Sequence, residues 1–452
     1  MVDNTEKNSP QQRLEILHNS LQTGSAEQVR RLLGDLHPAE IADLIESLPH
    51  GPRELIWELV PGDIHGAILL EVNEEVRASL IGEMEISQLI SATENMNTDD
   101  LADLVYNLPR TIIHELLLSM DKQNRNRLET VLSYPENTAG GLMDLDIITV
   151  RQTITLDVVL RYLRLRGEIP DLTDSLIVVN RLDQFQGLLP LTTLLTNDPE
   201  LSVADVMDTT IDGIPHSMAD IDVARLFQDH DLISAPVIND DGKLLGRITI
   251  DDVVDVIREE ADHSLMSMAG LDEDNDIFAP VITSAGRRAL WLGLNLATAF
   301  IAAWVIGLFE NTLEKVVALA ILMPIVASMG GIAGSQTLTI MIRGLALGQV
   351  GAANSRSLMY KEILVSLMNG LIWSIVVAAV TIIWFQRVDI GLIIGAALII
   401  NLLCASIAGF SIPLILKRAG IDPALAGGVL LTTVTDVVGF TAFLGLGALY
   451  LT

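Results

Sequence analysis

Hydrophobic and polar positions follow three successive patterns along this chain of 452 residues. In the first, apolar residues recur at helical spacing in short stretches over 14–134, with prolines between the stretches. The segment PAEIADLIESLP at 38–49 recurs as TDDLADLVYNLP at 98–109. Repeated short amphipathic helices are typical of a superhelical domain, whose hand the sequence leaves open. We therefore predict an all-α, superhelical N-terminal domain at residues 1–136.

The second pattern begins near Met143, where short β-branched runs alternate with helical stretches. DIITV, a helix and SLIVVN form one set, and TIDGIP, a helix and SAPVINDDGKLLGRITI form the next. This repeat predicts two β-α-β copies at about 143–200 and 207–262, within an α/β region at 137–262. The DDGKLLG hairpin, followed by a strand and a helix, resembles the CBS module, which occurs in tandem pairs.

The third pattern is a series of apolar stretches, each near or above the roughly 20 residues that cross a bilayer. Five such stretches run at about 289–309, 316–342, 363–385, 390–416 and 424–451. We predict a five-helix transmembrane domain at 289–452, with a connecting, or plug, helix at 263–288 before it. The expected fold class is therefore multidomain: helical domain, tandem CBS domains, connecting helix and membrane domain.

Charge divides the chain into two parts. The formal net charge is −30, yet the part from Arg287 onward holds only six acidic residues against nine basic ones. The preceding part holds 52 of the 58 acids and 19 of the 28 bases. Such an acidic region argues against nucleic acid and anionic lipid as partners and favours cations as ligands.

Basic residues also predict the orientation in the membrane. Arg287 and Arg288 precede the first span. Arg343, Arg356 and Lys361 lie between the second and third spans, and Lys417 and Arg418 lie between the fourth and fifth. By the positive-inside rule, the N-terminal region is cytoplasmic and the C-terminus lies outside. Five spans leave little room for an internal inverted repeat, so we expect a homodimer to form the pore.

Asp436 is a lone carboxylate inside the last apolar stretch. An ionisable group at bilayer depth is costly unless it faces water, an ion or a partner. On a helix it belongs to one continuous stripe of Gly428, Thr432, Thr435, Asp436, Gly439 and Phe443. We interpret Asp436 as a metal-binding residue of the ion path, with Thr432 and Gly439 lining the pore. The alternative is a packing face with a hydrogen-bonded acid, and the residues favour an ordinary packing role for Thr432.

The second apolar stretch contains helix-breaking residues. Pro324 removes a backbone hydrogen bond, and Gly330, Gly331 and Gly334 follow it. Irregular backbone at membrane depth is tolerated where it is buried or lines a water-filled cavity. We expect these glycines to line the pore. Gly330 and Gly334 also form a G-x-x-x-G pair that suits close helix packing, and the two roles are compatible.

Acidic residues cluster where the predicted domains should meet. The candidate metal ligands among them are Asp231, Asp252 and Asp255 in the second CBS copy, Glu260 after it, and Asp99 and Asp103 in the helical domain. Like charges repel, so a compact arrangement should require divalent cations between them. This predicts a sensor of divalent cations, unless the acids form only a solvated surface.

The order of these parts resembles the MgtE family of bacterial magnesium channels over nearly the whole chain. The motifs are YPENTAGGLM at 134–143, PIVASMGGIAGSQTLTIMIRGLALG at 324–348 and TTVTDVVGF at 432–440. The resemblance implies that Glu362 and Asp422 capture ions at the inner mouth. From the residues alone, a local ion pair or a helix N-cap fits them as well.

The chain departs from the family pattern at three positions. Ile332 stands in the glycine-rich turn where many members carry Asn, and His263 and Ser264 replace an acidic pair in the connecting helix. A side-chain amide contact in the pore is therefore not expected at Ile332. The departures at His263 and Ser264 are expected to alter the ion affinity of the gating sites.

The expected function is a magnesium-permeable channel of the bacterial inner membrane, gated by intracellular Mg2+. The CBS pair is an expected place for ATP or another adenine nucleotide. The sequence leaves open transport of Co2+, Ni2+, an anion or an osmolyte, or sensing without conduction. The apolar stretches carry no paired acids, histidine cluster or nucleophile, so we do not expect an enzyme.

Overall fold

The computed structural model describes residues 10–23, 26–93, 96–106, 108–271, 276–351 and 353–451. The remaining residues of the predicted domains, 1–9 and 452 among them, lie outside the described ranges. The chain divides into two compact units. The first unit is Met1–Asp262 with Asp274–Ala279, and the second unit is His263–Glu273 with Pro280–Thr452.

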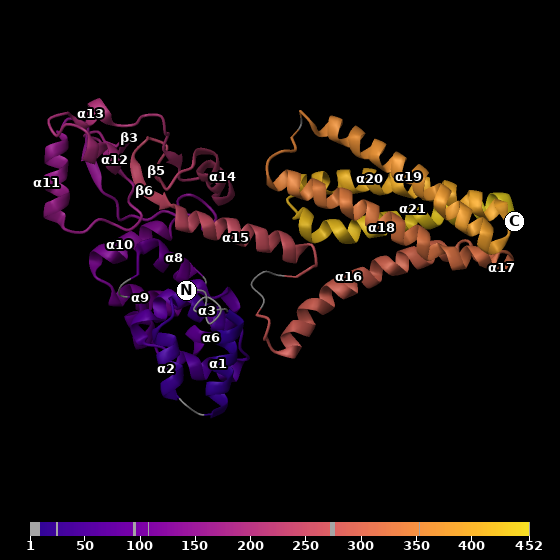
Figure 1. Ribbon diagram of the computed structural model, residues 1–452, viewed down its shortest axis with the longest axis horizontal. Coiled ribbons are helices and arrows are strands. Elements are labelled where there is room, and N and C mark those ends of the chain that lie inside the picture. The colour runs from indigo at the N-terminus through magenta and orange to yellow at the C-terminus, as the bar shows by residue number, and fades with distance from the viewer. Residues whose placement is uncertain are drawn as a thin grey trace, which may run out of the picture. The chain divides into compact units, whose positions relative to one another are not determined.

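The first unit begins with a helical domain (Figure 1). Its helices are α1 (Pro10–Thr23), α2 (Ala26–Gly34), α3 (Pro38–Glu46), α4 (His50–Trp57), α5 (His65–Glu71), α6 (Glu74–Glu83), α7 (Ile86–Thr93), α8 (Thr98–Tyr106), α9 (Arg110–Ser119) and α10 (Lys122–Val131), with a 3-10 turn at Gly62–Ile64. Helices α1, α3, α5, α7 and α9 pack each on the next of that series, and α8 packs on α10. This alternate packing confirms the helical repeat domain.

The sequence repeat corresponds to α3 and α8. Pro38 occupies the first turn of α3, and the backbone N–H of His37 donates to Glu40 Oε2 at 3.0 Å. Both helices bury the same four positions: Ile41, Ala42, Leu44 and Ile45 in α3, and Leu101, Ala102, Leu104 and Val105 in α8. The repeat therefore preserves one apolar helix face, which is the face that stacking buries.

Two small mixed sheets follow, with one fold repeated. The first copy has β1 (Thr149–Arg151), α11 (Leu156–Arg166), β2 (Ser175–Val179), β3 (Phe185–Pro190) and α12 (Leu191–Thr196). The second has α13 (Val203–Val206), β4 (Ile214–Pro215), α14 (Asp220–His230), β5 (Ser234–Ile238), β6 (Leu244–Thr249) and α15 (Ile250–Ser267). In each copy the first two strands are parallel and the last two form an antiparallel hairpin. The predicted CBS pair is confirmed.

The predicted connecting helix over 263–288 is not one helix. Helix α15 continues from the second CBS copy and ends at Ser267, and the next helix begins at Val281. Gly270 lies in the left-handed region with φ +69, and Pro280 precedes the new helix. A left-handed glycine ends a helix readily, and a proline disfavours helical backbone in the residue before it.

The second unit contains five described helices long and apolar enough to cross a membrane. They are α16 (Val281–Gly307), α18 (Val317–Ala346), α19 (Ser355–Phe385), α20 (Val388–Arg418) and α21 (Pro423–Leu451), with a short α17 (Glu310–Lys315) between the first two. Helix α20 packs on α18, α19 and α21, so it forms the centre of this unit. The five predicted spans are confirmed, although the first starts at Val281 rather than at 289.

Candidate functional site

Two helices of the first unit begin with paired acids. Asp99 and Asp100 lie in the first turn of α8, and Asp251 and Asp252 lie in the first turn of α15. A helix N-terminus attracts negative charge through its free N–H groups, which explains why acids are stable there singly. Both pairs act on one another electrostatically, so the fold brings the two helix starts into one acidic cluster.

The α8 acids hold their protons far more strongly than exposed carboxyls do. Burial and the charges of Asp144 and Asp100 raise the pKa of Asp99 to about 8. Burial and Asp100 raise the pKa of Asp103 to about 7, against an opposing effect of Arg77. Burial, followed by Asp251, raises the pKa of Asp100 to about 6. Nearby basic groups therefore do not neutralise this side of the cluster.

The α15 acids show the same effect. Burial, then the charges of Asp99 and Asp251, raises the pKa of Asp252 well above its usual value. The Oγ1 atom of Thr249 donates to Asp252 Oδ2 at 3.1 Å and partly offsets this. Burial also raises the pKa of Asp255. Arg77 and Arg258 only partly oppose these shifts, so the acids keep an excess of negative charge that a divalent cation could offset.

The acidic cluster is not a closed metal cage. Within the described ranges, only His50, Glu54 and Glu83 place one donor atom each within 4.8 Å of the others. Mg2+ keeps several of its waters and is usually held through one or two carboxylates. Since Asp99, Asp103 and Asp252 do not form such a close group, a hydrated ion of this kind is the one that they could hold.

The other predicted acids of the first unit lie elsewhere on its elements. Asp231 caps the C-terminal end of α14 in the left-handed conformation with φ 52, and its side chain is exposed. Glu260 lies two turns beyond Asp252 on α15 and is half-buried. Their roles as metal ligands stay predictions. Asp144, which the sequence analysis overlooked, lies in an irregular segment and could have been noticed only as one of several acids in MDLD.

In the second unit, Asp436 lies near the middle of α21 and is half-buried. The predicted stripe divides along its length: Thr432 is exposed, whereas Thr435, Gly439 and Phe443 are buried. Positions 432 and 436 form one row along the helix, and positions 435 and 439 form a second row about 60° away around the helix axis. The stripe therefore crosses from an open face to a packed face. Asp436 lies at that boundary.

Two threonines of the predicted stripe, of which Thr432 is a predicted pore residue, have protein partners. The Oγ1 of Thr435 donates to the carbonyl of Thr432 at 3.1 Å, and the hydroxyl of Thr432 lies 3.1 Å from the carbonyls of Gly428 and Val429. Each threonine therefore bonds to backbone of its own helix. The carbonyl of Thr432 therefore has one fewer lone pair free to accept from water.

The glycines of α18 differ in their surroundings. A Cβ at Gly330 would lie 2.2 Å from Asn401 Nδ2, and one at Gly334 would lie 2.8 Å from Leu431, whereas one at Gly331 would meet nothing within 4 Å. Gly330 and Gly334 thus permit close packing, and Gly331 lies on the open side. Pore lining by these glycines stays a prediction.

Asn401 is the buried polar residue that the sequence analysis missed. It lies on α20, is 0% exposed, and its Nδ2 donates to the carbonyl of Val326 in α18 at 2.9 Å. A Cβ at Gly439 in α21 would lie 2.6 Å from the same nitrogen. One amide thus contacts three helices. An isolated Asn inside a long apolar stretch was the available signal, because polar groups at membrane depth are rarely idle.

The acids at the helix ends have local partners. Asp422 caps α21, accepting from the N–H groups of Ala424 at 2.9 Å and Leu425 at 3.1 Å, and its Oδ2 lies 3.5 Å from His263 Nε2. Glu362 is buried, with Thr337 Oγ1 at 3.4 Å and Lys361 Nζ at 3.5 Å. Ion capture at these two positions stays a prediction.

An open groove of about 800 Å³ follows one face of α18. It is lined by Ser328, Gly331, Ile332, Ser335, Gln336, Thr339 and Ile340. Ile332 is 58% exposed in it, and the polar side chains at 328, 335, 336 and 339 are exposed as well. Lipid tails offer no hydrogen bonds to such a face.

Family comparisons agree with these parts. Three family profiles match: the MgtE intracellular N domain over residues 36–137, the CBS domain over 203–259, and MgtE, a divalent cation transporter, over 323–446. The magnesium transporter MgtE of Bacillus subtilis strain 168 is 28% identical over 431 residues, covering 95% of this chain and 96% of that protein. The magnesium transporter MgtE of Thermus thermophilus is 29% identical over 444 residues, covering 96% and 98%.

A crystal structure described as the cytosolic domain of the Mg2+ channel MgtE in complex with ATP is also similar. It is 29% identical and covers 54% of this chain and 99% of that one, with a TM-score of 0.49.

Five candidate spans, a CBS pair and a helical domain are the parts of a multi-pass membrane protein with a large extramembrane region. The matched profiles and the two relatives of nearly equal length make the assignment specific. The chain belongs to the MgtE family. Membership in a family of transporters confirms that the chain is not an enzyme.

Proposed function

We propose that this protein is a magnesium-permeable channel whose ion path includes Asp436. The observation that carries the proposal is the position of Asp436 near the middle of α21, half-buried at the border of an open face. A carboxylate at bilayer mid-depth requires an ion, water or a partner. One negative charge per chain attracts a divalent ion without caging it.

Magnesium is the cargo that the relatives favour, because both nearly full-length relatives are named magnesium transporters. Co2+ and Ni2+ carry the same charge and remain the alternative cargo. An anion or an osmolyte is a weaker alternative, since the charged group in the middle of α21 is acidic.

The working unit in this proposal is a homodimer. The exposed serine, glutamine and threonine side chains in the α18 groove would lack hydrogen-bond partners among lipid tails, and a second copy of the chain would cover them or enclose water with them. Two copies would also bring two Asp436 carboxylates to one path, which matches the charge of one divalent cation.

The membrane in this proposal is the bacterial inner membrane, with the N-terminus cytoplasmic and the C-terminus outside. The basic residues that flank the spans support this orientation. Both relatives are bacterial proteins.

Gating in this proposal depends on the acidic cluster. Intracellular Mg2+ would bind among Asp99, Asp103, Asp252 and Asp255 and hold the first unit compact, closing the channel. Asp231 and Glu260 are further proposed ligands. The CBS pair is proposed to bind ATP or another adenine nucleotide, and equilibrium binding of ATP to the whole protein tests that part.

Ion flux into proteoliposomes tests the ion path, with Mg2+ varied separately on each side. Asp436→Asn keeps the shape of the side chain and removes its charge, so we expect Mg2+ flux to fall by at least about tenfold. Asp389→Asn is the matched control, because Asp389 is an exposed acid at the start of α20. Equal flux in Asp436→Asn and wild type would exclude Asp436 from the path.

The mass of the detergent-solubilised particle tests the assembly. We expect two chains per particle, measured by light scattering with the detergent contribution subtracted. Gln336→Leu in the groove should leave the fold intact and change the proportion of monomer to dimer at a given protein concentration. A monomer that conducts Mg2+ at the full rate would contradict the dimer.

A further inference from the structure

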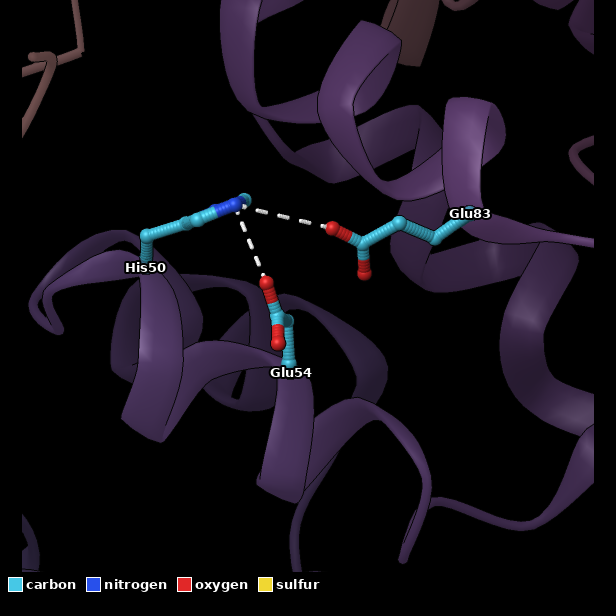
Figure 2. Close-up of side chains that lie close together, drawn as sticks. All are labelled: His50, Glu54 and Glu83. Atoms are coloured by element: carbon cyan, nitrogen blue, oxygen red, sulfur yellow. Dashed lines mark ion pairs between the residues drawn. The ribbon is translucent and has the colours of Figure 1, made fainter.

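A second group of metal-binding side chains lies in the helical domain, away from the acidic cluster. Figure 2 shows His50, Glu54 and Glu83 converging, the first two from one helix and Glu83 from another. The Nε2 atom of His50 is 3.0 Å from Glu54 Oε1 and 3.7 Å from Glu83 Oε1. One donor atom from each residue lies within 4.8 Å of the others.

The backbone holds these three side chains in register. His50 begins α4 and Glu54 follows one turn later, so both lie on one helix face. Glu83 ends α6. Both helices are anchored in the same hydrophobic core, through Ile56 of α4 and Leu80 of α6 among others. The packing of α4 and α6 on this core thus sets the distance between the donor groups.

The group carries an excess of negative charge. Burial, followed by the charge of Glu54, raises the pKa of the Glu83 carboxyl, against an opposing effect of His50. One imidazole therefore does not compensate two carboxylates. The three side chains are 62%, 43% and 37% exposed, so an ion could reach them from solvent.

We propose that His50, Glu54 and Glu83 bind one divalent transition-metal ion of the Zn2+, Co2+ and Ni2+ class. Donors around such an ion, with bonds of about 2.0–2.2 Å, lie about 3.0–3.6 Å apart, close to the 3.0 Å and 3.7 Å that separate His50 Nε2 from the two carboxylates. Three protein donors leave positions for water. Imidazole nitrogen favours these ions, whereas Mg2+ prefers oxygen ligands and its own waters.

The position of this site suggests what occupancy would affect. Arg53, on the same helix as His50, is buried and forms an ion pair with Asp276, 2.7 Å between Nη1 and Oδ2. Asp276 precedes α16 by five residues in the chain. A metal that joins α4 to α6 would therefore stiffen the helix that anchors the segment leading to the first span. The binding proposal itself does not rest on magnesium transport.

Cobalt titration of the full-length protein in detergent tests the site, using protein without a polyhistidine tag and with saturating Mg2+ present. We expect visible Co2+ absorption bands that saturate at one ion per chain and disappear on addition of Zn2+. His50→Gln and Glu83→Gln should each weaken Co2+ binding by at least about tenfold. His114→Gln is the matched control, because His114 is an exposed imidazole on α9.

Two outcomes would overturn the proposal. One is Co2+ binding in excess Mg2+ that is unchanged in both His50→Gln and Glu83→Gln, and the other is no saturable binding by the wild type. Circular dichroism of the variants verifies that the surface substitutions leave the fold intact. Failure of Mg2+ flux in the wild type would refute the proposed function and leave the Co2+ result unaffected.

Discussion

Asp99 combines burial with the charges of neighbouring acids. Its pKa is raised from 3.8 to about 8, so the folded protein binds a proton there that the unfolded chain releases. Such a group stabilises the fold fully below the unfolded pKa, and that stability is lost as pH rises towards 8. In the absence of divalent ions, the free energy of unfolding should therefore fall between pH 4 and pH 8.

Replacing this carboxyl by an amide isolates its effect. Asp99→Asn should raise the free energy of unfolding by about 1–3 kcal/mol at pH 8 in EDTA and should change it little at pH 4. Thermal unfolding of the whole protein at both pH values measures this. Asp240→Asn is the control, since Asp240 is an exposed loop acid. If the free energy of unfolding depends on pH equally in wild type and Asp99→Asn, ionisation of Asp99 beside its neighbouring acids does not cause the loss of stability.

Among the elements, α18, α20 and α21 meet at Asn401. Gly330→Ala should destabilise the membrane unit by about 1–3 kcal/mol, because its Cβ would approach Asn401 Nδ2 to 2.2 Å. Asn401→Ser in the same chain should restore part of the loss, with a coupling energy of about 0.5–3 kcal/mol. Unfolding midpoints in detergent complete this double-mutant cycle.

Gly331→Ala controls for helix propensity in that cycle. The new methyl group would meet nothing within 4 Å, so stability should stay equal or rise slightly. Strictly additive effects of Gly330→Ala and Asn401→Ser would contradict the contact.

The sequence predicted elements better than it predicted their junctions. Five apolar stretches were found from their length, and two β-α-β repeats from their alternating short runs, because a sequence displays both features directly. A long connecting helix is present as α15, but its bounds differ from 263–288 because it ends at Ser267, before residue 270 in its left-handed conformation. The sequence named Asp99, Asp103, Asp252 and Asp255, but could not show which acids are buried together, since burial depends on tertiary packing.

For the whole molecule, the acidic cluster predicts a compact state that depends on Mg2+. Limited proteolysis of the reconstituted full chain should show protection in millimolar Mg2+ and its loss in EDTA. The triple variant Asp99→Asn, Asp103→Asn and Asp252→Asn should be protected in both conditions, because the repulsion and the ion site disappear together.

A second triple variant keeps the total charge change equal. Glu200→Gln, Asp229→Asn and Asp240→Asn replace exposed acids outside the cluster and should preserve the wild-type response to Mg2+. If the cluster variant responds to Mg2+ as the wild type does, the sensing ions bind elsewhere.

The raised pKa values of Asp99 and Asp103 also make protons and Mg2+ rivals for one site. Near neutral pH these carboxyls hold protons for part of the time, with pKa values of about 8 and about 7. A cation can bind only to the ionised form, so each binding event expels protons into the surrounding solution. The proposed sensor would therefore respond to magnesium and acidity together: a drop in internal pH would weaken Mg2+ binding and also remove the repulsion, so that the compact state would depend less on Mg2+, whereas alkalinisation would make it depend more on Mg2+.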